Sequence, residues 1–178
     1  MQQQPSSVST LHPLRSQHSG FATHAAFRTS PLILHYDLLS SPSQAAARLI
    51  TQHREHPVPF DSEAFSVMLS TVYIEHEPTG FRITLTGTTE HPIRVIHILE
   101  AICTYFAEPI NRAHPAWQEL SHSRRARIRE SFNRRIASRP DPLGCIRRVD
   151  YLEGATRFAW IVVRPGSRNM VDLILRYP

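Results

Sequence analysis

The chain has 178 residues, of which 41% are apolar, and a formal net charge of +5, which fits one domain with its own hydrophobic core. All 20 basic residues are arginine, which excludes a Schiff-base lysine, a P-loop lysine and a lysine general base. Two cysteines, and the lack of an apolar run of about 18 residues, lead us to expect reduced thiols and a soluble protein of the cytosol or nucleus.

The beginning of the chain differs in composition from the rest. Residues 1–30 contain no Asp or Glu and are rich in Ser and Gln, so they cannot bury enough apolar surface to pack. We predict a disordered tail over these residues and a single domain over residues 31–178. The lack of acids, together with Arg15 and Arg28, also fits a mitochondrial presequence, which we keep as an alternative.

Strand patterns occupy the first half of the predicted domain. Residues 32–39 form a short extended apolar segment, and Ser40 to Ser43 favour a turn directly after it. Apolar and polar residues alternate over residues 65–75 and again over residues 81–86, with Pro78-Thr79-Gly80 between the two segments. We predict that these segments pair as an antiparallel hairpin.

Helical spacing replaces this alternation in the middle of the chain. Residues 95–106 carry apolar side chains three and four positions apart, which predicts one helix. A second helical region begins at Pro115, but Arg124 and Arg135 fall on its apolar face. We therefore expect a break in this region, with Ser123 as the N-cap of the longer helix.

A second β-hairpin is predicted over residues 148–158, because alternating runs flank Glu153-Gly154. This register places Asp150 opposite Arg157. Residues 171–177 alternate as a last strand. Together these elements predict an α+β fold, with an antiparallel sheet of roughly five or six strands packed against two main helices.

Four motifs carry a resemblance to a known family, and only the last of them is specific. They are Tyr36-Asp-Leu38 with Pro42-Ser43, the helical segment Ile98–Ile102, Ile128 with Phe132 and Arg135, and Arg148-Val-Asp-Tyr-Leu-x-Gly154-x-Thr-Arg-Phe158. Their order resembles an uncharacterised domain family that is abundant in mushroom-forming fungi. Arg94 departs from that family's pattern, in which a small capping residue begins the first helix. The resemblance implies a fold and a fungal origin, and no established activity.

Positive charge is concentrated near the second helix. Nine of the residues from 124 to 148 are arginine, against Glu130 and Asp141 as the acids. A basic helix of this kind can bind phosphates of nucleic acid with a steep salt dependence, whereas a solvated face is the simpler interpretation. Phe132 is the one aromatic residue among these arginines, whereas base stacking uses several interleaved aromatics. The candidate contacts to nucleic acid or a partner are Arg124, Arg125, Arg127, Arg129 and Arg134.

Arg135 calls for a different interpretation, because its helical position points it toward the core. A buried guanidinium without a partner costs several kcal/mol, so it needs a carboxylate nearby. We predict a structural network in which Asp150 pairs with Arg135 and Arg157 completes the charge balance between the hairpin and the helix.

Motifs for metal binding or catalysis are weak. His53-Arg-Glu-His56 lacks the spacing of zinc hydrolases, and we expect no metal site. Glu75 and Glu77 fall on one side of a strand, where an acid/base pair is conceivable. The sequence has no nucleophile elbow and no phosphate loop, so we expect neither catalytic residues nor a cofactor.

These observations favour a non-catalytic interaction module whose sheet edge or basic helical face binds another macromolecule, with a protein as the expected partner. The first alternative is a nucleic-acid-associated protein that uses the arginine-rich helix of residues 124–139. The second is an enzyme whose site is assembled only in three dimensions.

Overall fold

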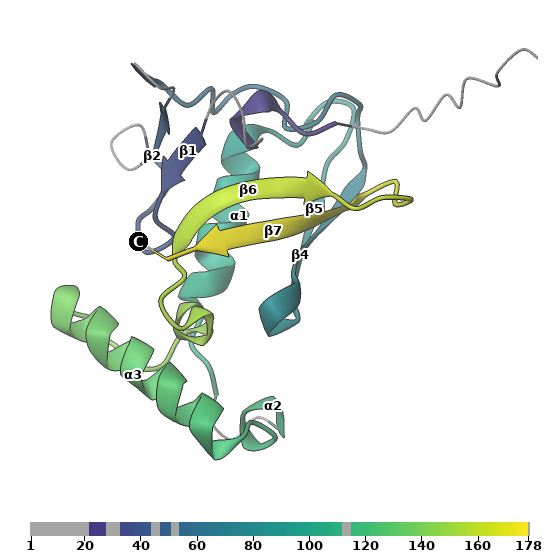
Figure 1. The fold of residues 1–178 in the computed structure, drawn as a ribbon. Helices are drawn as coiled ribbons and strands as arrows, with labels where there is room; N and C mark the ends of the chain where they lie inside the picture. The colour runs from purple at the N-terminus through teal and green to yellow at the C-terminus, as the bar shows by residue number, and fades with distance from the viewer. Residues whose placement is uncertain (1–21, 28–32, 44–46, 51–53, 112–114, 178) are drawn as a thin grey trace, which may run out of the picture.

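The computed structural model describes residues 22–27, 33–43, 47–50, 54–111 and 115–177. Within these ranges the chain has an α+β fold with two long helices and seven strands in two sheets (Figure 1). The smaller sheet is antiparallel with the order β1-β2-β3, and the larger sheet is mixed with the order β5-β4-β7-β6. The predicted fold class is confirmed, but the strands divide into two sheets and one pairing is parallel.

The strands are β1 (Ile33–Tyr36), β2 (Ala47–Ile50), β3 (Glu55–His56), β4 (Thr71–His76), β5 (Phe81–Thr86), β6 (Arg157–Val163) and β7 (Met170–Arg176). β4 and β5 form the predicted antiparallel hairpin around a short 3₁₀ turn, η2 (Glu77–Thr79), and Gly80. Gly80 has a φ of 69°, a left-handed conformation that glycine adopts without strain. The first strand of this hairpin is shorter than predicted, because regular pairing begins only at Thr71.

The larger sheet is completed by long-range pairing. β6 and β7 are antiparallel neighbours, and β7 lies parallel to β4, with Val171 beside Ile74. The residues directly after β1 pair with the start of β6 at its outer edge: Asp37 bridges to Arg157, and the Leu38 N–H donates to the Thr156 carbonyl oxygen at 3.0 Å. The opposite edge of the larger sheet is β5.

Helix α1 (Val95–Ala107) lies where the sequence predicts it and packs on the inner face of the larger sheet (Figure 1). Its N-cap is Arg94, whose backbone N–H donates to Nδ1 of His97 at 3.2 Å. A histidine three residues into the helix thus replaces the small capping residue. The buried side chains of α1 are Val95, Ile98, Leu99, Ile102 and Phe106.

The second helical region divides into α2 (Pro115–Gln118) and α3 (His122–Ser138), as predicted. The N-cap is Ser121 and not Ser123, because the Ser121 hydroxyl accepts the N–H of Arg124 at 3.3 Å. α3 lies below the sheets, against the 3₁₀ segment η3 (Arg148–Leu152) (Figure 1). The side chains buried there form a separate small cluster of Trp117, Ile128, Ile146 and Tyr151.

The hairpin predicted around Glu153-Gly154 is wrong. Its first arm is the helical segment η3, and the chain then reverses through Glu153 at φ 53° and Gly154 at φ 106°. The reason is the side chain of Asp150, which accepts the backbone N–H of Arg147 at 2.8 Å and so caps a helical turn. β6 instead forms a hairpin with β7.

Part of the predicted tail belongs to the folded domain. Residues 22–27 include the short 3₁₀ segment η1 (Ala25–Phe27), and the His24 N–H donates to the Ala64 carbonyl oxygen at 2.7 Å. Phe27 is fully buried, with its ring centroid 5.9 Å from that of Phe158. The prediction of disorder was therefore wrong for these residues, and residues 1–21 lie outside the described ranges.

His76 makes the stability of this fold dependent on pH. It is buried on β4 beside the ring of Phe106, with Nδ1 2.7 Å from the Thr79 hydroxyl, and burial lowers its pKa to about 4. Below pH 6.5 the His76 side chain is protonated in the unfolded chain, whereas in the folded protein it stays neutral until about pH 4. The free energy of unfolding therefore falls as the pH drops from 6.5 to about 4. We expect the loss at pH 4.5 to approach about 2–3 kcal/mol relative to pH 7.

Urea unfolding of the wild type and of His76→Gln at both pH values measures this effect. The variant is less stable at pH 7 but should lose less stability on acidification, because glutamine does not titrate. Equal losses in the two proteins would contradict the assignment to His76.

Candidate functional site

A buried ion pair joins α3 to η3, as the sequence predicts for Arg135 and Asp150. The Arg135 side chain is 9% exposed and that of Asp150 is 1% exposed. Arg135 Nε donates to Oδ1 of Asp150 at 2.9 Å, and Nη2 donates to Oδ2 at 3.0 Å. This two-point geometry holds the guanidinium in one orientation.

Asp141 is the second carboxylate of the network. It accepts Nη1 of Arg135 at 2.6 Å, and it accepts Nε and Nη2 of Arg147 at 2.9 Å and 2.8 Å. The bonds from Arg147 and Arg135 hold the pKa of Asp141 well below its usual range. Two arginines therefore face two aspartates, and the charges of this buried network balance.

Arg157 is not a member of the network, which corrects the sequence prediction. It is exposed at the start of β6 and lies opposite Arg176 of β7. The error follows from the hairpin register, which placed Arg157 across from Asp150. The charge-balancing arginine is Arg147, which immediately precedes η3.

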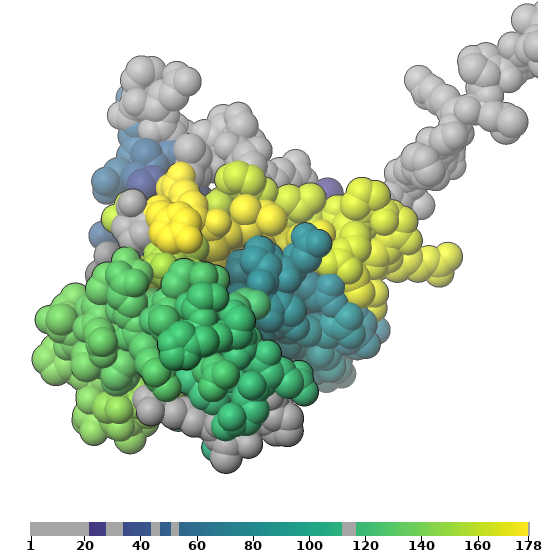
Figure 2. Space-filling view, turned by 60° about the horizontal axis from the view of Figure 1, so that its bottom comes forward, coloured from purple at the N-terminus to yellow at the C-terminus, as the bar shows by residue number. Residues whose placement is uncertain are grey.

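The first arginines of α3 hold this helix against neighbouring loops. Arg124 Nη2 donates to the Pro78 carbonyl oxygen at 3.3 Å, and Arg125 Nε donates to the Leu120 carbonyl oxygen at 3.0 Å. Figure 2 shows the result as a lobe of α2 and α3, in green, lying against the tip of the β4–β5 hairpin, in teal.

The next arginines of α3 contact the turn after η3. Arg127 Nε donates to Oε2 of Glu153 at 2.6 Å, and Arg134 Nη2 donates to the Glu153 carbonyl oxygen at 3.4 Å. Arg129 is exposed and forms no ion pair or hydrogen bond within the part of the chain that the structure describes. Of the five arginines predicted as macromolecule contacts, four are engaged inside the molecule.

Glu75 and Glu77, considered above as an acid/base pair, lie in different elements. Glu75 on β4 accepts from Arg82 and, at 2.7 Å, from Arg164, and these bonds from Arg164 and Arg82 lower the pKa of Glu75. A general acid needs the opposite shift. Glu77 lies beyond the strand, in η2.

The His53–His56 motif and the two cysteines are the remaining candidates for metal or thiol chemistry. His53 lies outside the described residues, so the His53–His56 motif has no described geometry. In the described ranges no three His, Cys, Asp or Glu side chains gather as a metal site. Cys103 and Cys145 are half-buried and are not joined in a disulfide.

The edge strand β5 offers a binding surface that the sequence analysis did not resolve. The Gly87 N–H donates to the Ser70 carbonyl oxygen at 3.0 Å, which fixes the alternation of hydrogen-bonded pairs along β4 and β5. By this alternation the N–H and C=O groups of Arg82, Thr84 and Thr86 point away from β4. No backbone partner bonds to them within residues 22–27, 33–43, 47–50, 54–111 and 115–177.

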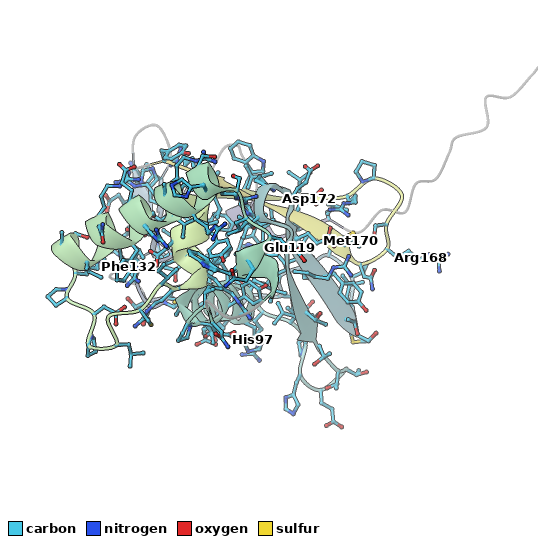
Figure 3. The ribbon with its side chains drawn as sticks, turned by 90° about the horizontal axis from the view of Figure 1, so that it is seen from below. His97, Glu119, Phe132, Arg168, Met170 and Asp172 are labelled. Atoms are coloured by element: carbon cyan, nitrogen blue, oxygen red, sulfur yellow. The ribbon has the colours of Figure 1, made fainter. Side chains whose placement is uncertain are left out.

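A groove of about 520 Å³ runs between β5 and α1, beside these free backbone groups. Its floor contains Ile83, Ala101 and Tyr105, and its rim is polar. His97, labelled in Figure 3, marks the exposed side of α1 that borders the groove. The lining side chains are those of Arg82, Ile83, Thr84, His97, Glu100, Ala101, Thr104, Tyr105, Glu108 and Arg148.

Comparison with known families places the chain. The profile of a family described as "Family of unknown function (DUF6699)" matches residues 34–169. The chain belongs to this family. No curated protein and no solved structure matches it.

The DUF6699 match begins in β1 and ends just before β7, so it includes both the buried network and the groove beside β5. None of the described helices of this DUF6699 protein is both long and apolar enough to cross a membrane.

The buried network predicts a large effect of one substitution. Asp150→Asn removes the charge that neutralises Arg135 and should lower the free energy of unfolding by about 3 kcal/mol. Glu55→Gln is a matched control, since Glu55 pairs with Arg48 at 3.8 Å on the surface and should cost less than about 1 kcal/mol. Thermal and urea unfolding measure both values. An unchanged midpoint for Asp150→Asn would exclude a stabilising role for the network.

Because four arginines of α3 bond within the molecule, we expect weak binding to nucleic acid. Titration of the full chain with labelled RNA and DNA at low and moderate salt should give a shallow salt dependence, equivalent to about one or two phosphates. A variant with Gln at Arg124, Arg125, Arg127 and Arg129 should bind little worse than the wild type. Tight and salt-steep binding that this variant loses would instead favour α3 as a nucleic-acid interface.

Proposed function

We propose that this protein is a non-catalytic module that binds another protein by pairing an extended segment of that partner with β5. The observation that carries the proposal is the row of outward-facing backbone groups at Arg82, Thr84 and Thr86, which has no partner among the described residues. A free strand edge is a template for a further strand, and peptide recognition domains use edges in this way.

The groove beside β5 supports the same proposal. A strand added to this edge points every second side chain toward α1, where the apolar floor of Ile83, Ala101 and Tyr105 can contact it. Backbone pairing supplies affinity and these side-chain contacts supply selectivity.

Nucleic acid remains the second candidate and an enzyme the third. Arg129 is the arginine of α3 most open to phosphate, and four neighbouring contacts would have to break to recruit Arg124, Arg125, Arg127 and Arg134. A protein partner requires no such rearrangement, which is why we rank it first.

The free state of both cysteines supports a location in the cytosol or nucleus, which we include in the proposal. The motif resemblance likewise supports a fungal origin.

A photo-crosslinking amino acid at Thr86 tests the proposal in the full chain. In native extract it should crosslink a partner that mass spectrometry identifies, while the same group at Glu130, on the exposed face of α3, should not. Thr84→Pro should abolish the crosslink, because proline removes an outward N–H without breaking the bonds to β4. Thr84→Val keeps the N–H and should retain the crosslink.

Two results would overturn the proposal. One is an equal yield from Thr86 and Glu130, and the other is a crosslink that survives Thr84→Pro. Unchanged thermal midpoints of the Thr84 variants establish that the strand itself is intact.

A further inference from the structure

We infer that the segment bound at β5 is basic and carries two Arg or Lys residues, four positions apart, that face α1. This inference rests on the proposed function, since it specifies which extended segment the groove accepts. It is not suggested by the composition of the chain, whose net charge of +5 would by itself attract an acidic partner.

Both arginines of the groove already pair with carboxylates. Arg82 pairs with Glu75 across β4 and β5 and lies 5.7 Å from the ring centre of Tyr73. Arg148 Nη1 is 2.8 Å from Oε2 of Glu108, and its guanidinium carbon lies 3.9 Å over the ring of Tyr105. Each arginine is thus neutralised by a carboxylate, so neither presents an uncompensated positive charge to a ligand.

The carboxylates of the groove offer a ligand one unpaired charge and further acceptor sites. Glu100 is exposed on α1 and forms no ion pair within the described ranges. The Glu108 side chain is 48% exposed, and a carboxylate that bonds one arginine can accept further donors. Glu108 is also the C-cap of α1, where the helix dipole adds negative potential. Since the two arginines are neutralised by their partners, Glu100 makes the charge open to a ligand negative.

The spacing of these carboxylates sets the spacing of the cations. Glu100 and Glu108 are eight positions apart, which corresponds to about 12 Å along a helix. In a strand, four positions cover about 13 Å, and residues separated by four point to the same side. In a bound strand that runs along α1, cations at the first and fifth positions thus match the two carboxylates.

The side chain midway between the two cations of the bound strand faces an uncharged part of the groove. The third position of such a strand points at the middle of the groove, where Ala101, Thr104 and Tyr105 lie between the two carboxylates. A small or apolar side chain fits this surface, because a charge there would be desolvated without a partner. The expected pattern is a basic residue, three intervening residues of which the middle one is apolar, and a second basic residue.

Selection from a random 12-residue peptide library displayed on phage, against the full chain, tests this pattern. We expect enriched peptides with basic residues at the stated spacing. For a labelled enriched peptide, fluorescence anisotropy should give an affinity that falls about tenfold in Glu100→Arg and becomes less dependent on salt. Glu130→Arg makes the same change of charge on the exposed face of α3 and should leave the affinity unchanged.

The Thr84 variants separate this inference from the proposed function. Peptides that lose binding in Thr84→Pro and keep it in Thr84→Val pair with the edge of β5. If such peptides show no basic preference, or no response to Glu100→Arg, the charge pattern is wrong and strand pairing still holds. If no enriched peptide loses binding in Thr84→Pro, the charge pattern and the proposed strand pairing are both wrong. Melting temperatures of all variants within a few degrees of the wild type exclude unfolding as the cause.

Discussion

The buried guanidinium of Arg135 is the constraint on which the lower half of the molecule depends. Such a group can leave water only if carboxylates meet it in good geometry, and here Asp150 and Asp141 do so from two segments that follow α3. Asp150 meets Arg135 from a helical turn that its own side chain caps at the Arg147 N–H, so the residue that neutralises Arg135 also holds residues 148–152 in a helical turn. One charge thereby fixes the path of the chain between α3 and β6.

Four further arginines of α3 extend the same principle to the surface. Arg124, Arg125, Arg127 and Arg134 bond carbonyl oxygens and Glu153 in the loops that surround the helix, so they fasten α3 to the sheet end. Planar guanidinium groups suit this work, because each can bond carbonyl and carboxylate oxygens at the same time. The net positive charge of the chain is thus a poor guide to the charge that a partner meets.

Local patterns predicted the elements whose neighbours are close in sequence. The β4–β5 hairpin and α1 followed from alternation, a turn and helical spacing, and the burial of Arg135 followed from its place on a helical face. The alternation before Gly154 led to a wrong prediction, because Asp150 fits a strand pattern until its pairing with Arg135 is known. The parallel pairing of β7 with β4 and the free edge of β5 depend on strand order, which no local signal encodes.

Glu100 and Glu108 beside β5 also bear on whether two copies of the protein pair through their β5 edges. A free strand edge invites the same edge of another copy, which would join two sheets into one. Antiparallel pairing of two β5 strands would set the α1 helices of both copies on the same face of the joined sheet, with Glu100 and Glu108 of each near those of the other. Carboxylates gathered in this way repel, so the same charge that we propose selects a basic strand would disfavour the pairing of two copies.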